Sequence, residues 1–325
     1  MWNKIKENGI VLAVIVLSVA AVILFQLFGV KSYSRYSTDS LHYEQGKVVE
    51  VSCENLEYDE ELGLYLGNQT LKVEITGGEQ KGEIIEVSNY LTKTHNVYAQ
   101  NGMKLIINAD TPENVQPYYT VYNYDRNIPI LSCCIILAAA IICIGRGKGV
   151  KAILGLGYSM FIIIYLVIPA VFSGYSPIWM SILCAVLSTA VTLLLLNGQS
   201  KKTYAAIIAT TIGVLFALLL FMLMSWMLHL NGFSSSEAES LILIHESTGL
   251  KIKDLLFAGV LISSLGAIMD VGMSIVSSLY EVQHHNPSIT TRQLFRSGIE
   301  IGKDMIGTMT NTLILAFTGS ALRHI

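Results

Sequence analysis

The chain has 325 residues, of which 52% are hydrophobic and 14% are charged, and its mean hydropathy is +0.54. Charged residues make up about a quarter of a typical soluble domain, so this composition excludes an ordinary soluble protein and indicates a membrane protein. The net charge of -3 offers no basic face for a polyanion, which argues against nucleic-acid binding.

Seven segments are long and apolar enough to be membrane-spanning helices, which need about 20 mostly apolar residues. They cover residues 9–30, 128–144, 152–172, 177–196, 204–228, 255–280 and 302–322. The first follows Lys4 and Lys6 and lacks a signal-peptidase cleavage pattern, so residues 1–30 are expected to form a retained signal-anchor helix. Residues 127–325 are expected to form a transmembrane helical bundle.

Residues 31–126 differ in composition, because they carry most of the acidic residues and several short alternating apolar and polar runs, such as Leu71 to Ile75. Alternation of this kind predicts strands, and Gly77-Gly78 and Asn101-Gly102 are turn signals between them. We expect a small all-β domain of five or six strands, either an OB-like barrel or a sandwich, between helices one and two. Such a domain could bind a ligand, although a docking surface for a partner is the commoner role.

The Lys and Arg residues of the short loops predict the orientation, since these residues concentrate on the cytoplasmic side of a membrane. A cytoplasmic N-terminus places one set of basic residues on a single face: Lys4, Lys6, Arg146, Lys148, Lys151, Lys201, Lys202, Arg292 and Arg296. The loop at 173–176 on the other face has no charge. This interpretation places residues 31–126 on the extracytoplasmic side of the membrane.

Asp270 is the most prominent candidate site residue, because it lies in the middle of the sixth predicted helix, at 255–280. An intramembrane carboxylate costs a few kcal/mol and usually faces the bundle interior or water. Ser274, Ser277, Ser278 and Glu281 follow Asp270 at helical spacing, so they share one face that leads toward the cytoplasm.

The seventh predicted helix, at 302–322, carries a matching polar stripe. Its members are Asp304, Thr308, Asn311 and Thr312, and Gly302 and Gly307 would allow close approach of a neighbour. Counted from the cytoplasmic ends of the two helices at 1.5 Å per residue, Asn311 and Asp270 lie at about the same depth in the membrane. We therefore expect a hydrogen bond between Asp270 and Thr308, Asn311 or Thr312. Two alternatives stay open: the hydroxyls are ordinary packing residues, and Asp304 forms a surface pair with Lys303.

Two shorter helices are expected beside these spans. The stretch from Ser288 to Ile299 follows an Asn286-Pro287 turn and has an amphipathic pattern typical of an interfacial helix. Residues 236–244 begin with the spacing of a capping box and predict a short outer helix.

No pattern for an enzyme or a cofactor is present. Of the five cysteines, four lie in apolar runs and Cys53 stands alone in the polar region, which leaves no zinc or disulfide spacing. The common hydrolase and nucleotide-binding signatures are missing. We therefore expect no enzymatic activity, no cofactor and no bound metal.

The residues around Asp270 and in the seventh helix resemble a known family. The motifs are Gly266-Ala-Ile-Met-Asp270-Val-Gly-Met-Ser274, Asn286-Pro287 and Gly302-Lys-Asp304-Met-Ile-Gly307-Thr308-Met-Thr310-Asn311-Thr312. They are similar to the YibE/F-like multi-pass membrane proteins, which are mostly bacterial. The resemblance implies a location in a bacterial plasma membrane and a small β domain after the first helix. The helix pair also resembles, more distantly, the layout of SecD/SecF and RND permeases, which implies proton-coupled work.

Two functions are consistent with these features. The first is a transporter or export component in which Asp270 binds and releases a proton or cation, with Ser274, Thr308, Asn311, Thr312 and Asp304 as further relay candidates. The second is a membrane scaffold whose outer β domain docks a partner and whose polar helix contact is purely structural. The expected partners are the lipid bilayer and a membrane protein or a second copy of the chain.

Overall fold

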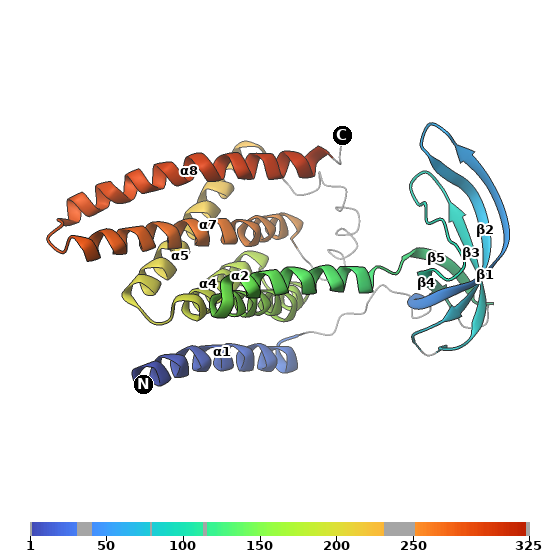
Figure 1. Cartoon of the computed structure of the whole chain (residues 1–325), viewed down its shortest axis with the longest axis horizontal. Helices are drawn as coiled ribbons and strands as arrows, with labels where there is room; N and C mark the ends of the chain where they lie inside the picture. Colours follow the sequence, from blue (N-terminus) through green and yellow to red (C-terminus); the bar gives the residue numbers. More distant parts are fainter. Residues whose placement is uncertain (1, 31–40, 79, 113–115, 231–250, 323–325) are drawn as a thin grey trace. The chain divides into compact units, whose positions relative to one another are not determined.

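The computed structural model describes residues 2–30, 41–78, 80–112, 116–230 and 251–322. The chain divides into two compact units. Residues 1–33 and 140–325 make up the helical unit, and residues 34–139 make up the unit that contains the strands (Figure 1). The short helix expected at 236–244 lies outside the described residues.

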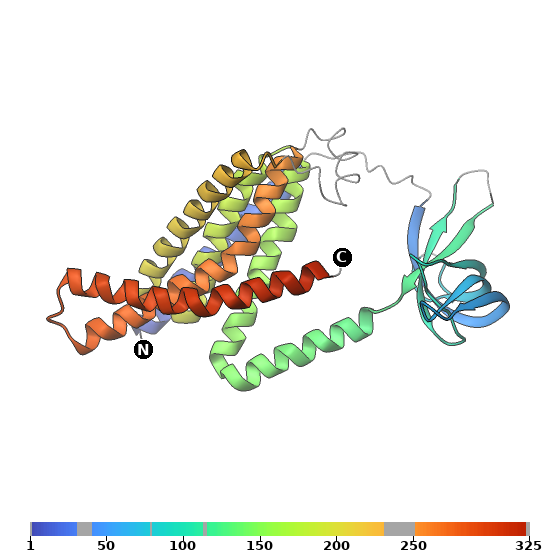
Figure 2. The same ribbon diagram turned by 90° about the horizontal axis from the view of Figure 1, so that it is seen from above.

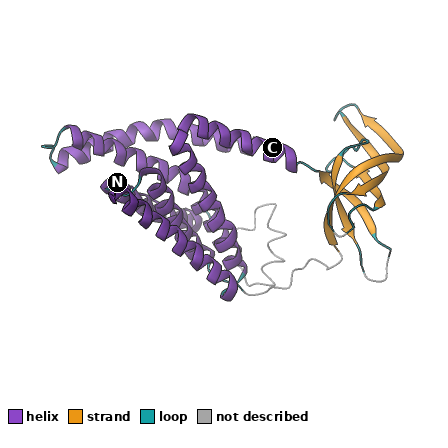
Figure 3. Ribbon diagram, turned by 60° about the horizontal axis from the view of Figure 1, so that its bottom comes forward, coloured by secondary structure: helices purple, strands orange, loops and turns teal. Residues whose placement is uncertain are grey.

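The strands form a closed five-stranded barrel, coloured orange in Figure 3. They are β1 (Leu41–Asp59), β2 (Leu64–Ile75), β3 (Ile84–Leu91), β4 (Lys104–Asp110) and β5 (Tyr118–Tyr124), in the spatial order β1-β2-β3-β5-β4. All neighbours are antiparallel except β3 and β5, which are parallel. The small all-β domain expected from the sequence is therefore a barrel and not a sandwich.

Strand β4 joins the first and last strands of the barrel. The first residue of β1, Leu41, lies opposite Asp110 at the end of β4. The last residue of β5, Tyr124, lies opposite Leu105 near the start of β4. The chain consequently enters and leaves the barrel at opposite ends of β4.

The barrel core follows the alternation seen in the sequence, because Leu71, Val73 and Ile75 are fully buried while the residues between them are exposed. Among the described residues of this unit, three polar side chains are buried: Glu44, Gln69 and Asn89. The Asn89 amide donates to Gln69 Oε1 at 2.9 Å and to the Val97 carbonyl at 2.7 Å. These hydrogen bonds tie the segment before β4 to β2 and β3.

The helical unit is built from long helices with few charges. Its elements are α1 (Trp2–Phe28), α2 (Asn127–Ile162), the π-helix η1 (Ile163–Val167), α3 (Ile168–Phe172), α4 (Pro177–Asn197), α5 (Lys201–Met227), α7 (Ile252–His285) and α8 (Thr291–Ala321), with the start of α2 belonging to the other unit. Among the described residues, four helical segments are long and apolar enough to cross a membrane: Asn127–Phe172, Pro177–Asn197, Lys201–Met227 and Ile252–His285. They make this a membrane protein, while the count of seven spans stays a prediction.

Helix α2 contains a backbone break at Arg146, where φ is 47° and ψ is -128°. Nearby, a Cβ atom at Gly149 would come within 2.3 Å of the Ile141 carbonyl oxygen, so only glycine fits there. The break falls between the two spans expected at 128–144 and 152–172.

Two apolar clusters hold the helical unit together, and α4 contributes to both. One joins α1 and α4 to the segment from Tyr158 to Val171, where the Tyr158 hydroxyl donates to Ser18 Oγ at 2.8 Å. The other joins α4, α5 and α7 through Ala185, Val214 and Leu261. The α4, α5 and α7 packing fixes which face of α7 is buried.

The expectation of a separate interfacial helix before a seventh span at 302–322 is wrong. One continuous helix, α8, runs from Thr291 to Ala321. Thr290 starts it with a capping box, in which its side chain and that of Gln293 satisfy each other's backbone N–H groups. The helix contains no proline that would break it. Its glycines at positions 298 and 302 are held by contacts with α7, so they do not end the helix either. Figure 2 shows α8 diverging from α7 toward its C-terminal end.

Candidate functional site

Asp270 lies near the middle of α7, and its side chain is exposed in the helical unit. Among the described residues, no donor lies within hydrogen-bond distance of its carboxylate and no cation pairs with it. An unpaired carboxylate in the middle of an apolar helix is unusual, because it is costly to place in a membrane.

The opposite face of α7 makes the contacts with the rest of the unit. Phe257, Ala258, Leu261 and Leu265 are buried against α4 and α5. Leu261 and Asp270 are nine residues apart, which is about two and a half helical turns, so their side chains leave opposite sides of the helix.

Small and polar residues occupy the side of α7 that bears Asp270. We call this set the α7 polar face; it consists of Gly259, Ser263, Gly266, Asp270, Ser274, Ser277 and Glu281, spaced three or four residues apart. All of them are exposed or partly exposed. The polar stripe expected from the sequence thus exists and extends beyond Asp270 in both directions.

Helix α8 contacts α7 through small residues. A Cβ atom at Gly298 would lie 3.1 Å from Leu279, and one at Gly302 would lie 3.6 Å from Ile275. The absence of side chains at these two positions allows the helices to approach each other closely.

The predicted relay residues of α8 lie on its other side. Gly302 and Asn311 are nine residues apart and therefore point in opposite directions, and Asp304 and Thr308 share the face of Asn311. The Thr308 hydroxyl donates to the Met305 carbonyl at 3.1 Å and the Thr312 hydroxyl donates to the Thr308 carbonyl at 3.2 Å, both within α8.

The expected hydrogen bond between Asp270 and Thr308, Asn311 or Thr312 is accordingly absent from the structure. Apolar and small residues provide the contact between α7 and α8. The threonine hydroxyls instead donate hydrogen bonds to backbone carbonyls of α8 itself. The alternative surface pair of Asp304 with Lys303 is also absent, since Lys303 pairs with Glu300 at 2.9 Å. Whether these residues relay a proton or cation stays a prediction.

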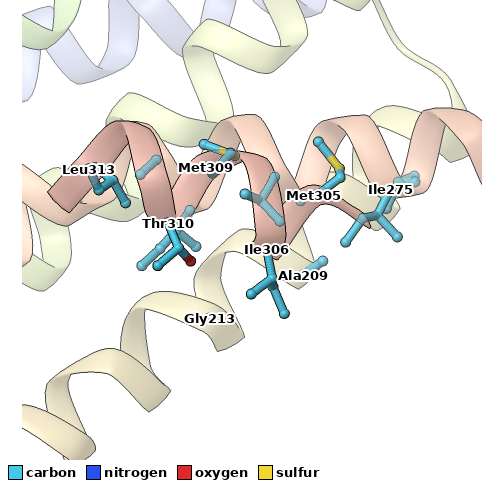
Figure 4. Close-up of a pocket in the computed structure, with 13 residues that line it drawn as sticks. Ala209, Gly213, Ile275, Met305, Ile306, Met309, Thr310 and Leu313 are labelled. Atoms are coloured by element: carbon cyan, nitrogen blue, oxygen red, sulfur yellow. The ribbon is translucent and has the colours of Figure 1, made fainter. Parts of the chain in front are cut away.

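An apolar groove of about 470 Å³ lies between α5, α7 and α8. Figure 4 shows Met305, Met309 and Leu313 of α8 beside Ala209 and Gly213 of α5. The sequence analysis missed this groove. The available signal was the four-residue spacing of Ala209 and Gly213, which brings two small residues to one face of α5.

The part of the chain that the structure describes holds no group of three His, Cys, Asp or Glu side chains that could bind a metal ion. The cysteines are all unpaired, and Cys184 is the buried one.

Comparison with known proteins identifies the family. The family model described as YibE/F-like protein matches residues 133–325, which include the whole of α4, α5, α7 and α8. No curated protein and no solved structure matches the chain, so the likeness to SecD/SecF and RND permeases stays a prediction. Because the match covers more than half of the chain and includes both motif-bearing helices, this membrane protein belongs to the YibE/F-like family.

Proposed function

We propose that the chain is a multi-pass transporter or export component in which Asp270 binds and releases a proton or cation. The observation that carries the proposal is the position of Asp270, on the unpacked face of an apolar helix without a partner among the described residues. Neither a cofactor nor an enzymatic activity is part of the proposal.

The cost of an isolated charge supports this role. A carboxylate in the hydrocarbon region costs a few kcal/mol unless it gains a proton, a cation, water or a polar neighbour. Ser274 and Ser277 follow on the same face and Glu281 lies toward the end of α7, so oxygen atoms line the route from Asp270 to that end. Thr308, Asn311, Thr312 and Asp304 are further candidates, which would act on the separate polar face of α8.

The proposed topology has seven spans, with the N-terminus in the cytoplasm of a bacterial cell and the barrel outside the plasma membrane. The break at Arg146 supports two passes within the 46-residue segment Asn127–Phe172. Gln80 of the barrel is a suitable reporter. A cysteine at position 80, in a background without native cysteines, should react with an impermeant thiol reagent in intact cells, and protection until lysis would contradict this topology.

Transport is tested with the full chain in lipid vesicles. Vesicles loaded with a pH-sensitive dye report proton movement when a potential is imposed, and candidate cations are tested as radiolabelled tracers. Asp270→Asn keeps the shape of the side chain but removes its titration, so the proton or cation flux should fall to the level of empty vesicles. The matched control is Asp254→Asn in the first turn of the same helix, which should retain the flux. Normal flux in well-incorporated Asp270→Asn vesicles would refute the coupling role.

Water access to Asp270 is tested separately by cysteine labelling. A cysteine at position 270 should react with a charged, water-soluble thiosulfonate, whereas a cysteine at the fully buried Leu261 should not. Lack of reaction at both positions would mean that lipid or another helix covers the α7 polar face.

The alternative function, a membrane scaffold, has one observation in its favour. Tyr58, Tyr65 and Tyr98 form a row on the barrel, with ring centroids 5.1 Å and 4.9 Å apart. Tyr58 is 53% exposed and Tyr65 is 41% exposed, and exposed aromatic rings are typical of protein docking sites. In this alternative, Asp270→Asn should leave the function of the chain in cells unchanged, whereas Tyr65→Ala should abolish binding of the partner.

A further inference from the structure

The groove between α5, α7 and α8 has a lining suited to a hydrocarbon chain. Ala209, Gly213 and Gly272 are small lining residues of α5 and α7, and Met305 and Met309 of α8 border the groove (Figure 4). A Cβ at Gly213 would lie 2.8 Å from Ile268, so the small residues let α5 and α7 approach each other closely beside the groove. Thr310 is the one lining residue that carries a polar side-chain atom, and methionine adapts its shape to flexible apolar ligands. A volume of about 470 Å³ is within the usual range for a small ligand. Only about one turn of an α-helix, which is about 10 Å across, would fit into it, so a helix of another protein is a poor occupant.

Basic residues lie toward one end of this groove. Helix α5 begins at Lys201, α7 ends at His285, and α8 begins at Thr291, and Figure 1 shows these three helix ends on the same side of the helical unit. The groove therefore has a cationic end that the sequence analysis assigned to loops of the cytoplasmic face.

Two lysines are placed on the groove side of their helices. Lys202 precedes the groove residue Ala209 by seven residues, and Lys303 precedes the groove residue Thr310 by the same number. Seven residues are close to two helical turns, so each lysine shares a face with its groove residue and lies about 10.5 Å from it along the axis. Arg292 precedes Thr310 by 18 residues, which is five turns, and lies on the same edge of α8.

The acidic residues nearby do not neutralise this end of the groove. Glu300 pairs with Lys303 at 2.9 Å, but both side chains are more than 60% exposed, and an exposed pair of this kind is weak enough to exchange for another anion. Glu281 belongs to the α7 polar face and points away from the groove.

We propose that this groove binds one acyl chain of an anionic membrane phospholipid, with the lipid phosphate held between Lys202 and Lys303. The apolar lining accounts for the acyl chain and the two lysines account for the charge of the headgroup, since basic pockets between transmembrane helices bind anionic lipid headgroups. The proposal does not rest on the transport function, because Asp270 lies on the opposite side of α7.

The test is native mass spectrometry of the full chain purified in a mild detergent. Phosphatidylglycerol and phosphatidylcholine with identical acyl chains are titrated in parallel, and the wild-type chain should retain phosphatidylglycerol preferentially. The double variant Lys202→Gln/Lys303→Gln should bind phosphatidylglycerol about 30-fold more weakly, from about fivefold for each lysine. Its binding of phosphatidylcholine should not change.

Two matched controls separate the headgroup and chain contributions. Lys251→Gln/Lys253→Gln removes the same charge at the other end of α7 and should leave the preference for phosphatidylglycerol intact. Ala209→Phe fills the groove and should reduce binding of both lipids, whereas Ile208→Phe on the neighbouring exposed position of α5 should not. Elution of each variant as the same monodisperse species in size-exclusion chromatography verifies that it is folded.

Three outcomes would overturn the proposal. Equal retention of both lipids by the wild-type chain would remove the role of the lysines, and unchanged binding in Ala209→Phe would remove the role of the groove. Competition by millimolar glycerol phosphate, which has no acyl chain, would mean that the site recognises free phosphate and not a lipid.

Discussion

The buried amides of the barrel give the sharpest stability prediction. Asn89 is 0% exposed and Gln69 is 1% exposed, and the Asn89 amide donates one hydrogen bond to Gln69 and one to Val97. Asn89→Ala removes both bonds. Gln69 Oε1 keeps the N–H of Ala99 as a donor at 3.1 Å, but the Val97 carbonyl loses the side-chain donor that ties it to β3.

The expected cost follows from these partners. An acceptor left without a partner in the interior costs about 1–3 kcal/mol, and the lost bond to Gln69 adds about 1 kcal/mol. Removing Asn89 Oδ1, a buried atom without a hydrogen bond to another described residue, returns part of this cost. We therefore expect Asn89→Ala to lower the free energy of unfolding of the barrel by about 2–3 kcal/mol.

Hydrogen exchange of the full chain in detergent measures this change. A loss of about 2–3 kcal/mol should speed exchange of the slowest barrel amides by about 30- to 150-fold. Asn68→Ala is the matched control, because Asn68 is the exposed neighbour of Gln69 on β2, and it should alter the rates less than about threefold. A similar small effect for Asn89→Ala would refute the view that the buried amides hold the segment before β4.

Three further predictions concern single residues. Gly67→Ala should destabilise the barrel by more than about 2 kcal/mol in urea unfolding, because the φ of Gly67 is +132° and the new Cβ would lie 2.1 Å from the Asn55 carbonyl oxygen. Gly82→Ala, where nothing lies within 4 Å of the new Cβ, should cost only about 1–2 kcal/mol. Thr290→Ala should cost about 1 kcal/mol at the start of α8 and speed hydrogen exchange of its first turn; unchanged exchange there would contradict the capping role. The hydrogen bond and charge of Glu50, 2.8 Å away, raise the pKa of Lys72 above 10.5, so Glu50→Gln should lower that pKa in an NMR titration. The pair favours the folded barrel below pH 10.5, and this contribution is lost as the pH rises through the raised pKa; a Lys72 pKa that Glu50→Gln leaves unchanged would exclude the pairing.

The strands were predictable because one periodicity decides them. Leu71, Val73 and Ile75 alternate with charged residues, and this pattern of period two fits only a strand with one buried face. Closure into a barrel was less certain from the sequence, since it depends on the parallel pairing of Ser88 with Thr120 between strands that are not consecutive. Local patterns contain no information about such a long-range pair.

Helix faces were harder to predict than helix positions. The polar stripes on α7 and α8 were visible in the sequence as residues three or four positions apart. Their pairing was wrong because Gly298 and Gly302 bring α8 onto Leu279 and Ile275, which turns Asn311 away from Asp270. Polarity shows which residues share a face of one helix, but the fit of apolar and small side chains decides which face packs against the neighbouring helix.

The connection of β4 to the first and last strands has a mechanical consequence. Tension between the chain segments before Leu41 and after Tyr124 pulls β1 and β5 in opposite directions along β4. The hydrogen bonds on both sides of β4 then bear the load together in shear, whereas in an unzipping geometry they would break one after another. We therefore expect the barrel to resist a pull on its two ends more strongly than a sheet loaded at a single strand edge would.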